Sequence, residues 1–338
     1  MSTQESPLFP PQERTVPQRG EATSTAAPAT SGSPAHGAVA PPGATDIAAR
    51  RHAGLWADAW RRLLRNRLAV LGGIIVLLLI FVAIFADRLA PYDPARQNYE
   101  AIQQGPSTRH LLGTDLLGRD VLSRLIYGAR VSITVGIFSQ LIVLLIGVPV
   151  GAVAALGGGR VDNLLMRFTD IVYAFPDLLF IILLSTVLSQ HPIKQVMGGM
   201  LVIFFAIGIV AWVSMARLVR GQLLSLREKE FVEAARALGA GEVRILWKHL
   251  LPNTLGPIIV ALTFGIPGAI FAEAALSYIG IGITPPMPSW GSMVQDGYKA
   301  IFGSTHLVVA PAAAIALTMM AFTFLGDGLR DALDPRMK

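Results

Sequence analysis

No cysteine occurs among the 338 residues of the chain. Disulfide bonds, thiol catalysis and cysteine-ligated metals are therefore excluded. Charged residues are also scarce, at 15% of the chain, whereas ordinary soluble proteins carry roughly 25%. Apolar residues supply 53% and are collected in long blocks that are almost free of charge. This composition excludes an ordinary soluble protein and predicts an all-α integral membrane protein.

The common signatures of enzymes and metal sites are missing too. None of the five lysines follows a glycine, so the chain lacks the Gly-Lys-Ser/Thr end of an ATP-binding phosphate loop. The six histidines show neither His-x3-His nor His-Glu-x-x-His spacing, and no Gly-x-Ser-x-Gly elbow occurs. We therefore predict that the chain is not an enzyme, holds no metal and binds no cofactor of its own.

Residues 1–54 differ in composition from the rest of the chain. Eight of the 22 prolines lie there among alanine, serine and threonine, and Phe9 is the only aromatic residue before Trp56. Such a segment cannot bury enough apolar surface to offset the entropy lost on ordering. It is predicted to be a disordered cytoplasmic tail, and it has no apolar core of the kind found in a signal peptide.

Six stretches are long and apolar enough to cross a bilayer core of ~30 Å, which takes about 20 helical residues. They are Leu68–Ala86, Val131–Leu156, Ile171–Ser189, Gly198–Ala216, Leu255–Ala272 with a continuation to about Thr284, and Leu307–Gly326. Two acidic residues fall within them, Asp177 in the inner half of the third and Glu273 in the outer half of the fifth. Each is a candidate for a transport path or, more simply, for a polar packing contact.

Orientation follows from the lysines and arginines. With the N-terminus inside, eighteen of them flank the spans on the cytoplasmic side and eight lie on the other side. The positive-inside rule then predicts a multi-pass protein with both termini in the cytoplasm. The same distribution accounts for the net charge of +6 without a nucleic-acid partner.

The region between the first two spans has a pattern of its own. Residues 55–130 are predicted to contain the first span and an extracytoplasmic segment, and residues 131–338 the transport core. In the outer segment, apolar residues share one helical face between Asp120 and Arg130. We predict a separate interfacial helix there, leading into the second span.

The cytoplasmic loop at residues 227–252 carries two apolar stripes at helical spacing. The first comprises Phe231, Ala234, Ala235 and Leu238, and the second comprises Val243, Leu246, Trp247 and Leu250. Gly239 stands where a helix commonly ends in a left-handed residue, and Pro252 is expected to end the second helix. The pattern predicts a helix–glycine–helix elbow, either lying on the membrane as an amphipathic connector or docking a cytoplasmic motor.

The spacing within this loop resembles a known motif. Glu233-Ala234-Ala235, three residues, Gly239, nine residues, His249, one residue, and Leu251-Pro252 is similar to the Glu-Ala-Ala motif of bacterial ABC importer permeases. The general motif has isoleucine where this chain has His249, but His-x-Leu-Pro-Asn is typical of the peptide and nickel branch. The resemblance assigns Glu233, Ala234, Ala235 and Gly239 to ATPase coupling, with His249, Leu251 and Pro252 in the returning part of the loop.

Three further stretches resemble the C-type permeases of dipeptide, oligopeptide and nickel importers. The first runs through residues 113–120, followed by Ser123-Arg124 and residues 128–132. The second pairs residues 273–280 with residues 285–291, and the third is residues 326–335. Together the four stretches extend the resemblance over about residues 55–338.

Membership of this family implies a type I ABC importer permease fold in the bacterial plasma membrane. The chain would form the path for dipeptides or oligopeptides together with a homologous B-type permease, and it would work by alternating access. Two cytoplasmic ABC ATPases using ATP and Mg²⁺, an extracytoplasmic peptide-binding protein and membrane lipid are the implied partners.

Two other functions stay open at this point. A nickel-chelate permease of the same family is the first, with His110, His191 and His306 on the outer side as residues that would meet the chelate. The second is an ATP-independent transporter or a membrane-anchored scaffold. For a transporter, Glu273 and Asp177 are the only intramembrane acids. These two acids do not suggest a proton relay.

Overall fold

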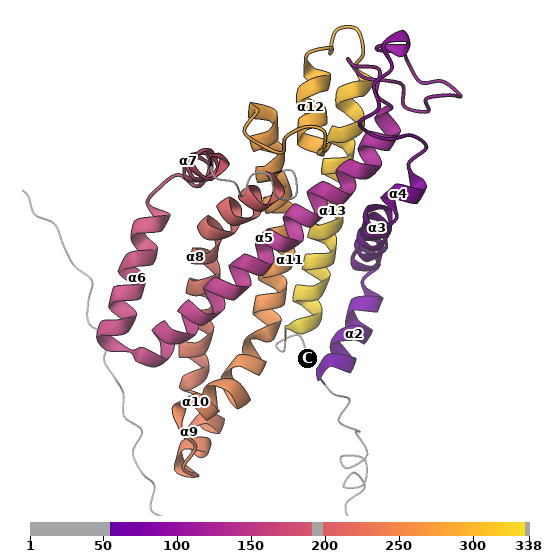
Figure 1. Cartoon of the computed structure of the whole chain (residues 1–338). Helices are drawn as coiled ribbons and strands as arrows, with labels where there is room; N and C mark the ends of the chain where they lie inside the picture. Colours follow the sequence, from indigo (N-terminus) through magenta and orange to yellow (C-terminus); the bar gives the residue numbers. More distant parts are fainter. Residues whose placement is uncertain (1–54, 191–198, 335–338) are drawn as a thin grey trace, which may run out of the picture. The chain divides into compact units, whose positions relative to one another are not determined.

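The computed structural model describes residues 55–190 and 199–334, so the predicted N-terminal tail lies outside the described residues. The described part is helical, with one isolated β-bridge between Thr114 and Asp120. The helices, shown in Figure 1, are α2 (Leu55–Arg65), α3 (Arg67–Ile84), α4 (Ala86–Leu89), α5 (Val121–Gly157), α6 (Gly159–Tyr173), α7 (Asp177–Ser189), α8 (Met200–Arg227), α9 (Glu230–Ala237), α10 (Glu242–Ile245), α11 (Leu251–Ile279), α12 (Trp290–Tyr298) and α13 (His306–Leu333).

Five of the described helical stretches are long and apolar enough to span a membrane. They are α3, α5, α8, the stretch Glu242–Ile279 that contains α11, and α13. A sixth span exists if α6 and α7 are counted as one bent span. The all-helical class is therefore confirmed, and the count of six holds with that bent span included.

The third predicted span is wrong as a single helix. The chain bends by 86° between α6 and α7, where Ala174, Phe175 and Pro176 separate the two helices. Proline has no backbone N–H and disfavours helical geometry at the residue before it, so the helix stops at this point. Most of residues 157–169, which separate the second and third predicted spans, lie in α6, and Asp177 lies at the bend rather than within a straight span.

The predicted interfacial helix at residues 120–130 is not separate either. It forms the first part of α5, which continues without a break to Gly157. The Asp120 side chain caps this helix by accepting from the backbone N–H of Ser123 at 2.8 Å. The helix continues past Val131 without interruption. Of the apolar face predicted for a surface helix, Val121 is buried in the protein, and Leu122, Leu125 and Ile126 are half-buried.

Glycines allow the longest helices to pack closely. A Cβ at Gly151 of α5 would lie 2.5 Å from the carbonyl oxygen of Ala216 in α8, and one at Gly72 of α3 would lie 2.5 Å from that of Ala321 in α13. Backbones approach in this way where small residues line an interhelical contact. The pairs α5–α8 and α3–α13 accordingly share more contacts than other helix pairs.

A cluster of buried charged side chains anchors the outer segment to the helices. Arg119 Nε donates to Asp115 Oδ2 at 2.7 Å, Arg124 also donates to Asp115, and both arginines reach Asp296 Oδ2 at 3.1 Å. Asp115, Arg119 and Arg124 are each less than 9% exposed. This cluster joins the loop before α5, α5 itself and α12, so it ties two distant parts of the sequence together.

A second contact fixes α12 against α5 and α11. Trp290 Nε1 donates to the carbonyl oxygen of Leu125 at 3.0 Å, and a Cβ at Gly128 would lie 2.8 Å from the same indole ring. On the other side, a Cβ at Gly291 would lie 2.5 Å from Ala274 Cα. The Ser-Trp-Gly sequence that marks the resemblance is therefore a packing element between three helices.

The ends of the described chain lie at the same end of the helix bundle. α2 packs on α13, and Arg62 Nη1 donates to the carbonyl oxygen of Asp334 at 3.4 Å. Figure 1 shows this end together with α9 and α10, whereas the segment before α5 lies at the opposite end.

At the opposite end, the side chains of Arg130 and Tyr127 donate hydrogen bonds to the Asp87 carboxylate. These bonds lower the pKa of that carboxyl to about 2.

Candidate functional site

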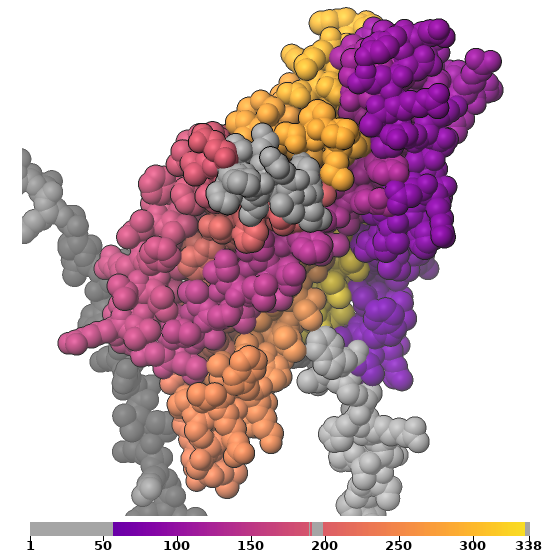
Figure 2. Space-filling view, in the orientation of Figure 1, coloured from indigo at the N-terminus to yellow at the C-terminus, as the bar shows by residue number. Residues whose placement is uncertain are grey.

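The elbow, residues 227–252, stands out from the bundle at the bottom of Figure 2, coloured orange. Its first helix, α9, ends at Ala237. Gly239 follows two residues later with a φ of +82°, the left-handed conformation that glycine adopts at little cost. The N–H groups of Gly239 and Ala240 donate to the carbonyls of Arg236 and Ala235 at 2.9 and 3.0 Å. This is the hydrogen-bond pattern of a Schellman cap, so the predicted left-handed helix end is confirmed.

The structure divides each predicted apolar stripe between two environments. Val232, Ile245 and Leu250 are fully buried, and Ala235 and Leu246 are nearly so, against residues of α5, α8 and α11. Five of the eight stripe residues remain exposed, namely Phe231, Ala234, Leu238, Val243 and Trp247. The elbow therefore presents one apolar face to the bundle and a second apolar face outward.

Ion pairs brace the elbow against the bundle. Arg227, at the end of α8, donates to the carbonyl oxygen of Ala155 near the end of α5 and approaches Glu242 Oε2 at 3.6 Å. Arg236 Nε of α9 donates to Glu242 Oε1 at 3.0 Å. Glu242 thus links α8, α9 and α10, so displacement of the elbow would carry α5 and α8 with it.

Pro252 does not end the second helix, contrary to the prediction. A π-helical turn at Leu246–Leu250 connects α10 to α11, and Pro252 lies in the first turn of α11. The backbone N–H of Leu251 donates to Leu246 O, the i→i−5 bond of a π-helical turn, and Pro252, which has no N–H, occupies the next position. His249 contacts the Phe231 ring, with centroids 6.5 Å apart, so it connects the two arms of the elbow.

Replacing Gly239 with proline is expected to unfold the elbow. Proline cannot adopt a φ of +82° and would remove the N–H that donates to Arg236. Trypsin should then cut the variant at the basic residues of the elbow several times faster than the unaltered chain. The matched control is Gly241→Pro, because Gly241 has a φ of −70°, which proline adopts without strain. Equal cleavage of both variants would contradict the role given to Gly239.

A cavity of about 390 Å³ lies between α5, the α6–α7 bend, α8 and α11. Its polar lining includes Gln140, Tyr173, Asp177 and Ser214, and most of the remainder is apolar. Arg217 lies 4.6 Å from the centre of the Tyr173 ring, with its own charge paired to Asp170 at 2.9 Å. Asp177, one of the two predicted intramembrane acids, thus lines a cavity that is enclosed by several helices.

Glu273 does not line this cavity. Its side chain is fully buried between α5, α11 and the start of α12, with Ser277 Oγ donating at 2.6 Å and Ser132 Oγ at 3.4 Å. Ser289, which caps α12, is hydrogen-bonded to the same Ser277 hydroxyl at 3.3 Å. The structure thus does not bring the two acids together, and Glu273 lies in a serine network that connects three helices.

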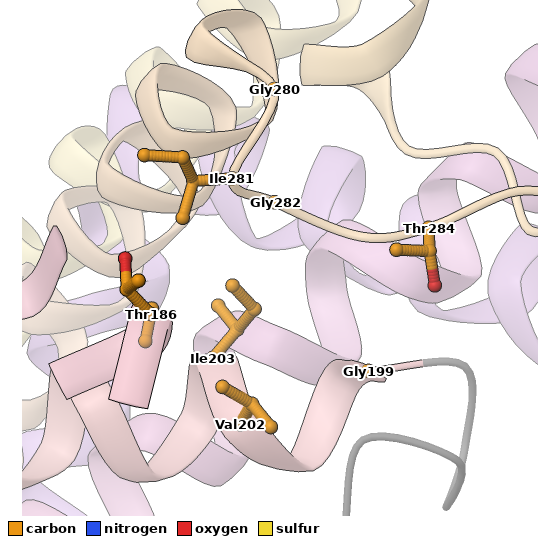
Figure 3. Close-up of a pocket in the computed structure, with 9 residues that line it drawn as sticks. Thr186, Gly199, Val202, Ile203, Gly280, Ile281, Gly282 and Thr284 are labelled. Carbon is orange, nitrogen blue, oxygen red and sulfur yellow. The ribbon is translucent and has the colours of Figure 1, made fainter. Parts of the chain in front are cut away.

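A smaller cavity, of about 210 Å³, lies between α7, the beginning of α8 and the end of α11. Figure 3 shows Thr186, Val202, Ile203 and Ile281 around it, and Gly199, Gly280 and Gly282 also line it. The two cavities lie along α8, whose opposite end leads into the elbow. A helix of 28 residues spans about 42 Å at 1.5 Å per residue, so α8 connects all three features.

The two outer histidines that the structure describes, His110 and His306, belong to no group of metal-ligating side chains. His110 Nδ1 lies 2.9 Å from Asp120 Oδ1, and His306 lies beside Gly113, while His191 is outside the described residues. Within residues 55–190 and 199–334, no three His, Cys, Asp or Glu side chains are grouped as metal ligands would be.

Comparison with known proteins identifies the family. The profile of "Binding-protein-dependent transport system inner membrane component" matches residues 147–338, more than half of the chain. The chain belongs to this family of permeases. A second profile, the "N-terminal TM domain of oligopeptide transport permease C", matches residues 54–106 of the permease.

Similar curated permeases cover nearly the whole chain. It is 42% identical over 301 residues to the oligopeptide transport system permease protein OppC of Bacillus subtilis, covering 89% of this chain and 96% of that one. It is 45% identical over 282 residues to the dipeptide permease DppC of the same organism, covering 83% and 86%. The glutathione permease GsiD of Pectobacterium atrosepticum is 40% identical over 284 residues, covering 84% and 92%.

The fold agrees with this assignment. A chain of the MetNI methionine ABC transporter, in an inward-facing conformation, superimposes with a TM-score of 0.52 at 19% identity, covering 63% of this permease and 97% of that chain. The permease therefore has the type I ABC importer fold predicted from its motifs. It is a multi-pass membrane protein of a family of transport subunits rather than catalytic ones.

Sequence reasoning missed two features of the permease. Gln140 of α5 and Gly265 of α11 meet at the central cavity, and Asp296 completes the outer ion cluster. Each pairing joins helices that are distant along the chain, and no local spacing indicates it. Only the lone glutamine within a predicted span could have drawn attention to Gln140.

Proposed function

We propose that this permease subunit moves dipeptides or oligopeptides into the bacterial cell as part of an ABC importer. The observation that carries the proposal is its similarity, at 42% and 45% identity over most of the chain, to permeases named for oligopeptides and dipeptides. A third relative is named for glutathione, which is itself a tripeptide. Peptides are thus favoured over a nickel chelate, and an ATP-independent transporter is not favoured.

The elbow is the proposed contact with the ATPases. Its exposed apolar residues, Phe231, Ala234, Leu238, Val243 and Trp247, form a surface that the described part of the chain leaves uncovered. Exposed apolar groups of this kind are typical of protein interaction sites. Small Ala234 would let the partner approach closely, while Glu233 and Ala235 keep α9 helical and seated on the bundle.

Coupling of the ATPases to transport would depend on the buried contacts that join the elbow to the helix bundle. Closure of two ATPase subunits around ATP and Mg²⁺ pushes the elbow, and the packed contacts of Val232, Ile245 and Leu250 transmit the displacement to α5 and α8. Both helices line the central cavity, so access to the cavity changes with the state of the ATPases. ATP and Mg²⁺ belong to the ATPases in this proposal, and this chain binds neither.

The remaining partners follow from the same scheme. A homologous B-type permease would complete the translocation path, and an extracytoplasmic peptide-binding protein would deliver the substrate to the segment before α5. Both termini and the elbow would face the cytoplasm, in keeping with the excess of lysine and arginine on that side.

Deletion of the gene tests the proposal in cells. We expect the deletion strain to lose most uptake of radiolabelled trialanine and to regain it when the chain is supplied from a plasmid. Uptake of ⁶³Ni²⁺ with a chelator should stay unchanged in both strains. Loss of nickel uptake with normal peptide uptake would contradict the proposed substrate and restore the nickel-chelate alternative.

A further inference from the structure

The central cavity contains a carboxylate that the chain does not neutralise. Asp177 is exposed at the first turn of α7 and lines the cavity, yet it makes no ion pair or side-chain hydrogen bond among the described residues. The nearby Arg217 is already paired with Asp170 at 2.9 Å. An unpaired charge in a membrane protein is costly and commonly marks a substrate path.

A buried amide faces the same cavity. Gln140 of α5 is only 8% exposed and lines the cavity, and its carboxamide has no hydrogen-bond partner among the described residues. Gln140 therefore offers one acceptor and two donors to a molecule that enters the cavity.

The opposite wall makes room for this amide. The Gln140 carboxamide lies over Gly265 of α11, where an added Cβ would overlap it and would come within 2.9 Å of Nε2. Glycine at this position is thus required for the amide to stay where it lines the cavity. A glutamine that merely filled space would not need its polar end seated against bare backbone.

We propose that Asp177 and Gln140 form a substrate subsite, which binds the α-ammonium group and the first peptide amide of the transported peptide. This inference rests on the proposed function and adds to it the residues that select the substrate class. A carboxylate matches the ammonium charge, and a carboxamide can accept from a peptide N–H and donate to a peptide carbonyl. The volume of about 390 Å³ lies in the ~300–1,000 Å³ range of small-molecule sites.

The experiment measures transport and ATP hydrolysis by the whole importer in proteoliposomes, with saturating trialanine-loaded binding protein. Asp177→Asn removes the charge and keeps the side-chain shape, so peptide turnover should fall about tenfold, the scale expected for a lost charged hydrogen bond. Binding-protein-stimulated ATP hydrolysis should stay within twofold of normal. The number of ATP molecules hydrolysed per peptide then rises, which a merely structural defect would not produce. Asp177→Glu should restore most of the turnover.

A second variant tests the amide independently. Gly265→Ala should displace the Gln140 carboxamide and lower peptide turnover severalfold, again with ATP hydrolysis retained. Its matched control is Gly256→Ala on the same helix, where the added Cβ meets only Leu333 Cβ at 3.5 Å. Asp327→Asn, at an exposed acid of α13 outside the cavity, is the control for charge removal.

Two results would overturn the proposal. The first is normal turnover of trialanine by both Asp177→Asn and Gly265→Ala, and the second is equal loss of turnover and of ATP hydrolysis in both. Failure of the unaltered importer to transport trialanine would instead overturn the proposed function, so the two failures can be told apart.

Discussion

Ala234→Trp is expected to abolish ATP-driven peptide uptake while the chain inserts and folds normally. Ala234 is exposed on α9, so the larger side chain has room within this chain. It would project from the surface proposed to meet the ATPase, and overpacking a close contact costs about 1–3 kcal/mol. We expect uptake to fall about tenfold or more in cells that contain equal amounts of the variant and the unaltered protein.

The neighbouring alanine provides a contrast. Ala235 is 9% exposed and packs against the bundle, so Ala235→Trp should lower the amount of folded protein as well as uptake. Ala57→Trp, at an exposed position of α2 away from the elbow, is the control for a bulky surface residue and should have little effect. Normal uptake by a well-expressed Ala234→Trp variant would refute the docking role of this face of α9.

Asp115→Asn is expected to cause the largest loss of stability among single substitutions in the outer segment. Asp115 is 3% exposed and accepts from both Arg119 and Arg124, which are themselves buried. Without its charge, two buried guanidinium groups share the single carboxylate of Asp296. Breaking a buried ion pair in this way costs about 3–5 kcal/mol. The thermal midpoint of the detergent-purified chain should fall by roughly 10 °C.

Two further variants serve as comparisons for the loss of stability in Asp115→Asn. Asp87→Asn removes the exposed pair with Arg130 and should change the midpoint much less, because exposed pairs contribute little. The double variant Asp115→Asn with Arg119→Gln keeps the charge of the cluster balanced and should recover part of the loss. A midpoint for Asp115→Asn equal to that of the unaltered chain would show that the cluster does not hold the outer segment.

Local patterns allowed much of the fold to be predicted. Uninterrupted apolar runs located the spans in α3, α8 and α13, and the spacing around Gly239 predicted the elbow and its left-handed helix end. These features depend on residues within one or two helical turns of each other. Pro176 was visible in the third span, but the sequence alone did not show that neighbouring helices leave the backbone there broken rather than merely kinked.

Features that depend on distant residues could not be predicted. Arg119 and Asp296 are 177 residues apart in the sequence, and Gln140 meets Gly265 across two helices, so no periodicity links either pair. The exposure of individual elbow residues could not be predicted either. Spacing placed Phe231 and Leu238 on an apolar stripe with Ala235, and only the structure shows that Ala235 is buried while the other two are exposed.

Site-specific cross-linking at the elbow tests the central claim most directly. The chain contains no cysteine, so Leu238→Cys introduces a unique thiol at a side chain that is 89% exposed. A maleimide cross-linker with a photoreactive end should capture an ABC ATPase subunit from Leu238→Cys in native membranes, identified by mass spectrometry. The same reagent on Leu111→Cys, 63% exposed in the outer segment, should capture no ATPase. Capture of an ATPase from Leu111→Cys, or none from Leu238→Cys in membranes that retain peptide uptake, would contradict the account.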